Sequence, residues 1–385
     1  MVTCRARDIP PFIVMDILER AQQMERAGRD VIHLEIGEPD FDTPECIKEA
    51  ARRAITEGHT HYTHSLGLLE LREAIAEYYH QNYGTPVSPD HILVSSGTSP
   101  AMFMIFAALL EAGDEVILSN PHYACYPNFI NFFQARPVFV NVDEADGFQY
   151  RPEAIAQLLT GRTKAVFVNS PANPTGTLLS PERMRIIAED SPLVISDEIY
   201  HGLVYGGDKA RSILEFTDRA FVINGFSKLF AMTGWRLGYV IAPEDFVRPL
   251  QKIQQNFFIS ASSVSQKAGV AALREAGPDV ERMRRTYDER RRFLLAGLRR
   301  LGFNILVEPT GAFYVLVNAR HLNPDSYRLA FDILEKARVG VTPGIDFGAN
   351  AEGYLRFSYA NSIEKIEEGL WRLEKYLEHC EPAGA

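Results

Sequence analysis

Cysteine is scarce in this sequence, and the few that are present form no metal or redox motif. The four residues are scattered among 385 positions, with no Cys-x-x-Cys and no histidines at metal-ligand spacing: Cys4, Cys46, Cys125 and Cys380. A disulfide framework and a zinc motif therefore have no support, and we expect free thiols in a reducing cytosol and no bound metal.

The sequence also lacks an excess of positive charge and any long apolar run. Its formal net charge of −10 argues against nucleic acid or an anionic membrane as a partner. The longest apolar run, Ala101–Leu110, is too short to span a bilayer. The first residues, Met1–Asp8, contain no apolar segment of the kind found in secretory signals. We therefore expect a cytoplasmic protein that binds neither nucleic acid nor membrane.

Apolar runs alternate with helical periodicity between residues 45 and 280. Many runs are unbroken, as expected of strands covered on both faces, and helices such as Pro181–Glu189 lie between them. The strand candidates are His91–Val94, Glu115–Leu118, Val138–Val142, Ala165–Val168, Leu193–Ile195, Phe221–Ile223 and Tyr239–Ile241. This pattern predicts an α/β fold with a mostly parallel seven-stranded sheet between helices, and such sheets bind ligands at the carboxyl ends of their strands.

The remainder of the chain has a different pattern. It contains a long charged helix, two further strand candidates and a final helix with Asn361 and Glu364 placed as a capping box. The two strand candidates are Phe313–Val317 and Leu355–Tyr359. We interpret this part as a smaller α+β unit, joined by the helix Val14–Arg26.

Two domains are expected, because 385 residues exceed what a single core usually supports. We predict a large domain over residues 45–280. Residues 1–44 and 281–385 would form the small domain.

Lys228 and Arg236 are the most informative pair of residues. Lys228 ends the segment Asn224–Lys228 after an apolar run, and Arg236 follows eight residues later between glycines. A lysine fixed at the end of a buried strand can act as a nucleophilic amine, and a nearby arginine can hold a phosphate. A solvated loop lysine is the alternative.

The segment Ser95–Pro100 follows a strand and opens an apolar helix. Its glycine and its small hydroxyl residues, Thr98 and Ser99, leave backbone N–H groups free to bind an anion at the start of the helix. A capped turn without a ligand is the alternative.

Three further polar or aromatic segments follow predicted strands. Tyr123 could stack on a flat ring or pack in the core, and Asn173 could face a ligand or form an Asx turn. Asp197 could pair with a protonated ring nitrogen or cap a helix, and Tyr200 follows it as a possible hydrogen-bond donor.

Arg356 lies inside the apolar run Tyr354–Tyr359. The planar guanidinium pairs with a carboxylate through two hydrogen bonds, so Arg356 is a candidate for binding a substrate carboxylate. A structural ion pair is the alternative.

Taken in order, these segments resemble the class I and II aminotransferases, which are pyridoxal-phosphate enzymes of fold type I. The resemblance extends over nearly the whole chain. It is carried by Leu34–Phe41, Tyr62–Thr63 with Gly67, Asn173–Gly176, Ser227–Lys228 with Arg236–Gly238, Gly311–Tyr314 and Arg356.

The resemblance implies a role for each residue around the ring of the cofactor. Lys228 would form the Schiff base with the cofactor aldehyde and later transfer the proton between substrate and cofactor. Asp197 would keep the pyridine nitrogen protonated. Asn173 and Tyr200 would bind the phenolic oxygen, and Tyr123 would stack on the ring.

The resemblance also implies sites for the phosphate and for the substrate. The phosphate would be held by Thr98, Ser99, Arg236 and, with less support, Ser227. Tyr62 would reach the phosphate of a neighbouring subunit, which implies a homodimer with shared active sites. Arg356, Asn173 and the backbone of Gly37 would bind the substrate.

The implied activity is transfer of an amino group from an L-amino acid to a 2-oxo acid. The segment Ser260–Ser265 carries no basic residue for a second substrate carboxylate, and Phe12 and Ile13 lie in the expected lid, which favours a neutral or apolar donor. A Cβ–S lyase of the same fold is the alternative within the family. A ligand-sensing transcription regulator would need an added basic helix-turn-helix, and the sequence has no segment for one.

Overall fold

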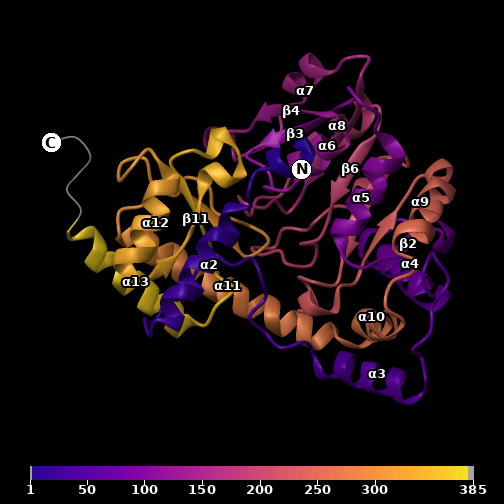
Figure 1. Ribbon diagram of the computed structural model, residues 1–385, viewed down its shortest axis with the longest axis horizontal. Helices are drawn as coiled ribbons and strands as arrows, with labels where there is room; N and C mark the ends of the chain where they lie inside the picture. The colour runs from indigo at the N-terminus through magenta and orange to yellow at the C-terminus, as the bar shows by residue number, and fades with distance from the viewer. Residues whose placement is uncertain (1, 380–385) are drawn as a thin grey trace.

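A seven-stranded sheet forms the centre of the larger part of the molecule (Figure 1). The computed structural model describes residues 2–379, so Cys380 lies outside the described residues. The sheet has the order β2-β8-β7-β6-β5-β3-β4. The strands are β2 (Ile92–Ser95), β3 (Glu115–Asn120), β4 (Arg136–Asn141), β5 (Thr163–Asn169), β6 (Val194–Asp197), β7 (Ala220–Gly225) and β8 (Gly238–Ile241).

The sheet is mostly parallel, as the sequence predicts. Strands β3 to β7 pair in parallel, and β8 runs antiparallel to both of its neighbours, β2 and β7. All seven strand candidates are confirmed with shifts of one or two residues at their ends. Because β5, β6 and β7 are parallel neighbours, their carboxyl ends meet at one edge of the sheet.

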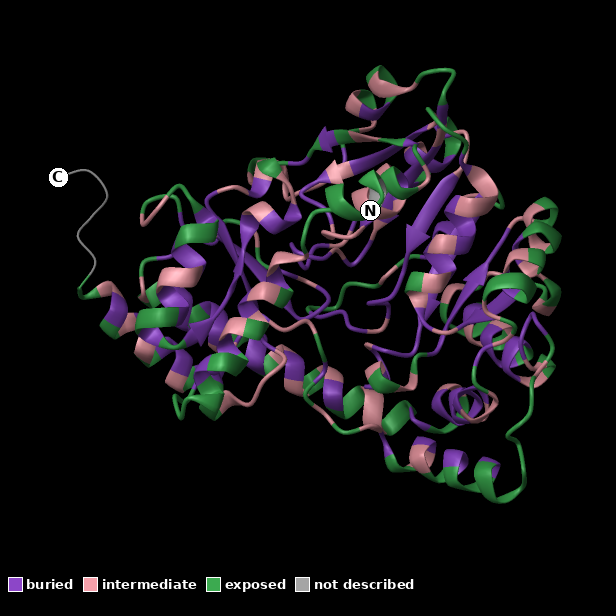
Figure 2. Cartoon of the chain, in the orientation of Figure 1, coloured by how far each residue is buried: buried purple, intermediate pink, exposed green. Residues whose placement is uncertain are grey.

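Helices cover both faces of this sheet, and successive strand residues enter different cores. Phe221 and Ile223 of β7 pack with the helices of one face, whereas Val222 packs with those of the other. The first face is covered by α5 (Thr98–Leu109), α6 (Tyr126–Phe132) and α9 (Glu244–Phe257). The second is covered by α4 (Leu69–Tyr83), α7 (Pro152–Leu158), α8 (Pro181–Asp190) and α10 (Ser263–Glu275). Figure 2 shows the buried strands between helices whose outer faces are exposed.

Most of the remaining elements lie at the left of Figure 1, where the chain ends, but α3 (Glu45–Thr56) packs against α10 at the lower right. A three-stranded sheet has the order β11-β12-β9, and β1 pairs with β10. The strands are β1 (Ile32–His33), β9 (Tyr314–Asn318), β10 (Val339–Gly340), β11 (Thr342–Pro343) and β12 (Tyr354–Ser358). The helices are α1 (Cys4–Asp8), α2 (Ile13–Arg26), α3 (Glu45–Thr56), α11 (Gly277–Arg300), α12 (Ser326–Ala337) and α13 (Ile363–Leu377).

Short 3-10 helices connect several of these elements. They are η1 (Pro89–His91), η2 (Glu144–Asp146), η3 (Ile213–Glu215), η4 (Thr233–Trp235), η5 (Gly344–Phe347) and η6 (Ala349–Ala351). Helix α11 runs beneath both parts of the molecule, from α10 toward α13 (Figure 1). The division into domains at residues 44/45 and 280/281 stays a prediction.

The predicted cap of the last helix is wrong by one residue. Ser362, not Asn361, is the N-cap of α13, and its hydroxyl accepts the backbone N–H of Lys365 over 3.3 Å. Asn361 instead accepts the N–H of Ser362 and donates to the carbonyl oxygen of His33. The helix begins at Ile363, so only the preceding residue has the extended backbone of an N-cap.

Within residues 2–379, no helix is long and apolar enough to cross a membrane. The same residues contain no group of three histidine, cysteine or acidic side chains arranged to hold a metal ion.

Candidate active site

A cavity of about 350 Å³ lies at the carboxyl ends of β5, β6 and β7. It brings together eleven of the twelve predicted site residues from segments far apart in the sequence. These are Gly37, Thr98, Ser99, Tyr123, Asn173, Asp197, Tyr200, Ser227, Lys228, Arg236 and Arg356. Tyr62 does not line it and is 84% exposed, so within one subunit it takes no part in the cavity.

Lys228 follows β7 and donates a hydrogen bond from Nζ to the carbonyl oxygen of Gly37 over 2.6 Å. Burial lowers the pKa of the Lys228 ammonium to about 8, and the nearby carboxylate of Glu38 opposes this shift. Because the neutral amine is the nucleophile, Lys228 is close to its reactive state near neutral pH.

The start of α5 forms an anion site together with Arg236. Gly97, the N-cap, has a φ of 94°, and no side chain caps the first turn of α5. A Cβ atom at Gly97 would lie 2.6 Å from Nη2 of Arg236, so the absence of a side chain lets the guanidinium lie against the helix start. Arg236 is held there by a bond from Nη1 to the carbonyl oxygen of Thr233. Free backbone N–H groups, a helix dipole and a guanidinium are together suited to a phosphate.

Asp197, the last residue of β6, is 4% exposed and faces the cavity. Its carboxylate accepts hydrogen bonds from the hydroxyl of Tyr126 (2.8 Å) and the backbone N–H of Ile199 (3.1 Å). No helix begins at this residue, which excludes the N-cap alternative. Burial raises the pKa of Asp197 to about 6, although these two hydrogen bonds oppose the shift. A cationic N–H partner in the cavity would lower it again.

Arg356 is buried in β12 and has no ion-pair partner among the described residues. Its guanidinium donates to Oδ1 of Asn173 (2.9 Å), to the carbonyl oxygen of Glu35 (2.6 Å) and to the hydroxyl of Thr342 (3.1 Å). Its Nε makes no hydrogen bond to any of residues 2–379. The structural ion pair is therefore excluded for residues 2–379, and a buried cation with only neutral partners is suited to an external carboxylate.

Tyr200 is buried, and its hydroxyl lies 2.9 Å from the hydroxyl of Tyr314. The ring of Tyr314 also lies beneath Arg356, 4.3 Å from the guanidinium carbon to the ring centre. Tyr123 also lines the cavity, and its ring contacts Phe12 edge-on. Aromatic rings thus form part of the cavity wall.

Sequence reasoning missed several residues that line the cavity. Tyr126 and Tyr314 occur within motifs that the sequence singles out, but their hydroxyl partners depend on the fold. Helix α2 contributes Val14, Met15 and Leu18, whose helical spacing is the only signal. Phe12 lines the cavity as expected, whereas the other expected lid residue, Ile13, does not.

Comparisons with known proteins place the chain in a family. Residues 29–373 match the family model described as "Aminotransferase class I and II". The chain is 42% identical over 381 residues to the (5-formylfuran-3-yl)methyl phosphate transaminase of Methanocaldococcus jannaschii, covering 98% of this chain and 100% of the relative. It is 40% identical over 372 residues to the aspartate aminotransferase of Pyrococcus horikoshii, covering 95% and 94%.

A solved structure from Methanococcus jannaschii is similar over 98% of this chain and 100% of that chain. The TM-score is 0.91 at 42% sequence identity, and that protein is described as similar in its active site to kynurenine aminotransferases.

Proposed function

The chain belongs to the class I and II aminotransferases and depends on pyridoxal 5′-phosphate, and we propose that its amino donor is an L-amino acid with a neutral or apolar side chain. The amino group would pass to a 2-oxo acid. The observation that carries the proposed donor class is that the cavity lining has no lysine or arginine beyond Lys228, Arg236 and Arg356. None of the named relatives above is a Cβ–S lyase, and nothing favours that alternative.

The residues present fit the cofactor. The phosphate would bind at the start of α5, where the first turn has no side-chain cap and Gly97 admits Arg236. Thr98, Ser99 and Ser227 line the same part of the cavity and supply hydroxyl groups. When bound, pyridoxal phosphate supplies an electron-accepting ring conjugated to the reacting carbon.

Asp197 would pair with the nitrogen of that ring. The carboxylate already accepts two hydrogen bonds, and a third, cationic donor would lower its raised pKa and hold it charged at neutral pH. Tyr123 lines the cavity as the candidate for stacking on the ring.

Asn173 and Tyr200 would bind the phenolic oxygen of the cofactor. Oδ1 of Asn173 accepts from Arg356, which leaves Nδ2 of Asn173 as the group that donates into the cavity. Tyr200 can donate its own proton when its oxygen accepts from the hydroxyl of Tyr314.

Lys228 would hold the cofactor covalently and then act on the substrate. Its neutral Nζ would accept the proton from Cα of the substrate, and the pKa of about 8 suits a base at neutral pH. Arg356 would orient the substrate by its α-carboxylate.

The proposed substrate class depends on the charges in the cavity. Its lysine and arginine residues are Lys228, Arg236 and Arg356, and each has a proposed partner in the cofactor or the α-carboxylate. A second substrate carboxylate would find no fourth cation among the lining residues and would meet the carboxylate of Glu38. The facing wall is apolar and consists of Phe12, Val14, Met15 and Leu18.

We also propose a homodimer in which Tyr62 completes the phosphate site of the partner. Tyr62 is almost fully exposed in one subunit. Its loop is fixed to the body of the protein, because Ser263 donates to the carbonyl oxygen of His59 and Gln251 donates to the hydroxyl of Ser65. Phe257 and Ile259, at the end of α9, are also exposed. Exposed aromatic and apolar side chains on fixed segments are suited to a subunit interface. The cytoplasm is the proposed compartment.

The test is a panel of amino acids added singly to the enzyme loaded with pyridoxal phosphate. Conversion of the aldehyde form to the amine form is followed by absorbance, and a 2-oxo acid should reverse it. We expect alanine, leucine and phenylalanine to react with at least about tenfold higher kcat/KM than aspartate, because an unpaired buried carboxylate costs more than about 1.4 kcal/mol. Conversion by aspartate alone would overturn the substrate class, and no conversion by any amino acid would overturn the activity.

A further inference from the structure

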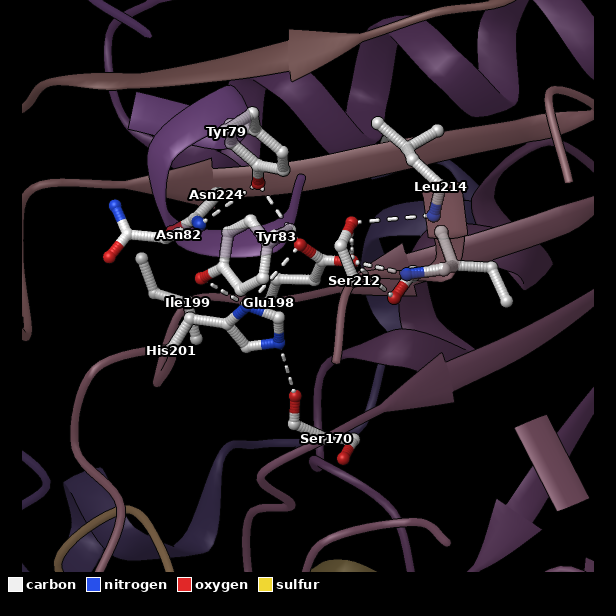
Figure 3. Close-up of polar contacts among 12 residues, drawn as sticks. Tyr79, Asn82, Tyr83, Ser170, Glu198, Ile199, His201, Ser212, Leu214 and Asn224 are labelled. Carbon is white, nitrogen blue, oxygen red and sulfur yellow. Dashed lines mark hydrogen bonds and ion pairs between the residues drawn. The ribbon is translucent and has the colours of Figure 1, made fainter. Parts of the chain in front are cut away.

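A second set of buried polar side chains (Figure 3) does not line the cavity. We call it the Glu198 cluster. It consists of Tyr79, Tyr83, Ser196, Glu198, His201, Ser212 and Asn224. Glu198 directly follows Asp197 in the chain but does not line the cavity, because its carboxylate lies among the other members of the cluster.

Glu198 is fully buried, and its carboxylate is the centre of the cluster. Oε1 accepts the backbone N–H of Ile213 (3.0 Å) and the hydroxyls of Ser212 (2.9 Å) and Ser196 (3.3 Å). Oε2 accepts the hydroxyl of Tyr79 over 3.0 Å. Four donors around one carboxyl group are arranged for an acceptor, the role of the ionised form. Burial nevertheless raises the pKa of Glu198 to about 7.

His201 has its tautomer fixed by its partners. Nε2 lies 3.0 Å from the carbonyl oxygen of Ser170, which can only accept, so Nε2 carries the proton. Burial lowers the pKa of His201 to about 3, so the ring is neutral and Nδ1 accepts the hydroxyl of Tyr83 over 2.8 Å. Nδ1 also lies 3.4 Å from Oε2 of Glu198.

The cluster connects the carboxyl ends of three parallel strands. His201 holds the carbonyl of Ser170, which begins the loop from β5 to Asn173. Tyr79 accepts from Nδ2 of Asn224 in β7, four residues before Lys228. Glu198 itself lies in the chain between Asp197 and Tyr200.

We propose that Glu198 is a positioning residue for the cofactor site. Its carboxylate fixes Tyr79 and the other donors, and through them holds the ends of β6 and β7 at the spacing that Asp197 and Lys228 require. It also places a negative charge behind Asp197, which favours a cationic ring in the cavity. This inference rests on the proposed function, because the positioned residues are those assigned to the cofactor.

The test compares Glu198→Gln with Glu115→Gln. Glutamine keeps the size of the side chain, but its amide N–H groups replace a carboxylate oxygen that accepts hydrogen bonds from the surrounding donors. Glu115 also has almost no exposed surface, but it accepts from Thr160 and the exposed Arg136 at the start of β3, and it lies outside the cavity. Both substitutions remove a buried, hydrogen-bonded carboxylate, but only one of them acts behind Asp197.

For Glu198→Gln we expect a loss in kcat of about 10- to 100-fold, with the KM for the amino acid changed less than about threefold. The pH at which the absorbance of the bound cofactor titrates should fall by about half a unit or more, because an anion that favours the cationic form has been removed. Glu115→Gln should change neither kcat nor the titration of the bound cofactor, although both variants should melt at a lower temperature.

A loss of thermal stability in Glu198→Gln with wild-type kcat and an unchanged titration would overturn the positioning role. If that variant does not fold, Tyr79→Phe gives a second test, since it cuts the link to Asn224 and leaves three of the four donors to Glu198 in place. Tyr79→Phe should lower kcat about tenfold, and a wild-type kcat would contradict the proposal. Failure of the wild-type protein to bind pyridoxal phosphate would overturn the proposed function itself, and that outcome is visible before any variant is made.

Discussion

Arg356 donates a hydrogen bond from Nη1 to Oδ1 of Asn173 over 2.9 Å, although the two residues are 183 positions apart in the sequence. The bond joins the residue proposed to bind the substrate carboxylate to a residue proposed to bind the cofactor. It also fixes which end of the Asn173 amide faces the cavity. We therefore expect substrate binding and cofactor orientation to be coupled through this contact.

Replacing Arg356 by lysine should weaken binding of the substrate far more than binding of the cofactor. A lysine lacks the planar fork that pairs with a carboxylate through two hydrogen bonds, so kcat/KM should fall by about 100-fold, equivalent to about 3 kcal/mol. Steady-state kinetics and cofactor titration would measure the two effects. Arg183→Lys is the control, because Arg183 is partly buried and pairs with Asp146 away from the cavity. A wild-type kcat/KM for Arg356→Lys would show that Arg356 does not bind the substrate carboxylate.

Replacing Lys228 by alanine should leave the cofactor bound without a covalent link and abolish turnover. Loss of the general base alone should reduce the rate by about 10²- to 10⁴-fold, and loss of the covalent attachment adds to this. Borohydride reduction followed by mass spectrometry should trap the cofactor on the wild-type protein but not on the variant. Transamination by Lys228→Ala at the wild-type rate would show that the assignment is wrong.

Replacing Gly97 by alanine should weaken the phosphate site. The new methyl group would displace the guanidinium of Arg236, and we expect the dissociation constant for pyridoxal phosphate to rise by about tenfold or more, equivalent to the loss of one charge-assisted hydrogen bond. Gly113→Ala is a matched control, because Gly113 has a similar positive φ of 87° but no atom within 4 Å of its Cβ position. Both variants should lose stability from backbone strain, and equal cofactor affinity in the two would contradict the predicted site.

Attachment of pyridoxal phosphate to the cofactor-free protein should depend on pH through Lys228. Burial lowers the pKa of this ammonium to about 8, so the fraction of reactive neutral amine rises with pH and reaches half near pH 8. The rate should increase roughly tenfold per unit below pH 8 and level off above it, as stopped-flow absorbance can measure. For Nα-acetyl-lysine in solution, which keeps a free side-chain amine, the rate should rise in the same way but level off only above its own pKa of about 10.4. If the rate for the protein had the same pH midpoint as the rate for this amine, the lowered pKa of Lys228 would be wrong.

Mixed dimers should show whether Tyr62 acts across the subunit interface. A dimer with Lys228→Ala in one subunit and Tyr62→Ala in the other would contain one site with both residues intact, if Tyr62 serves the partner. Such a dimer, isolated with two affinity tags, should recover about half of the wild-type activity, because one of its two sites is complete. If Tyr62 acts within its own subunit, neither site is complete and no activity returns. A monomer in sedimentation analysis would exclude the shared site.

Much of the fold could be predicted from the sequence because it depends on local pattern. Unbroken apolar runs bounded by turns located all seven strands of the large sheet, and Ser180 with Pro181 marked the start of α8. The ends of elements were less certain, as the cap of α13 shows: Asn361 and Ser362 are both good capping residues, and the helix start decides between them.

The residues of the site could also be named from the sequence, because parallel strands present their carboxyl ends together and a motif marks each end. Their partners could not. Asp197 needed a hydrogen-bond donor, but only the fold shows that Tyr126 supplies it. Tyr314 likewise has its hydroxyl partner, Tyr200, on a separate element.

The sequence by itself therefore determined the class of chemistry: an amine, an anion site and a carboxylate site at the edge of a parallel sheet. Tertiary structure decided how these groups are held, because burial and long-range contacts set their charge and direction. Lys228 lies against Gly37, and Arg356 lies against Asn173 without a carboxylate partner among the described residues. Glu198 is an acidic residue beside Asp197 in the sequence, and only its burial among four donors separates its role from that of its neighbour.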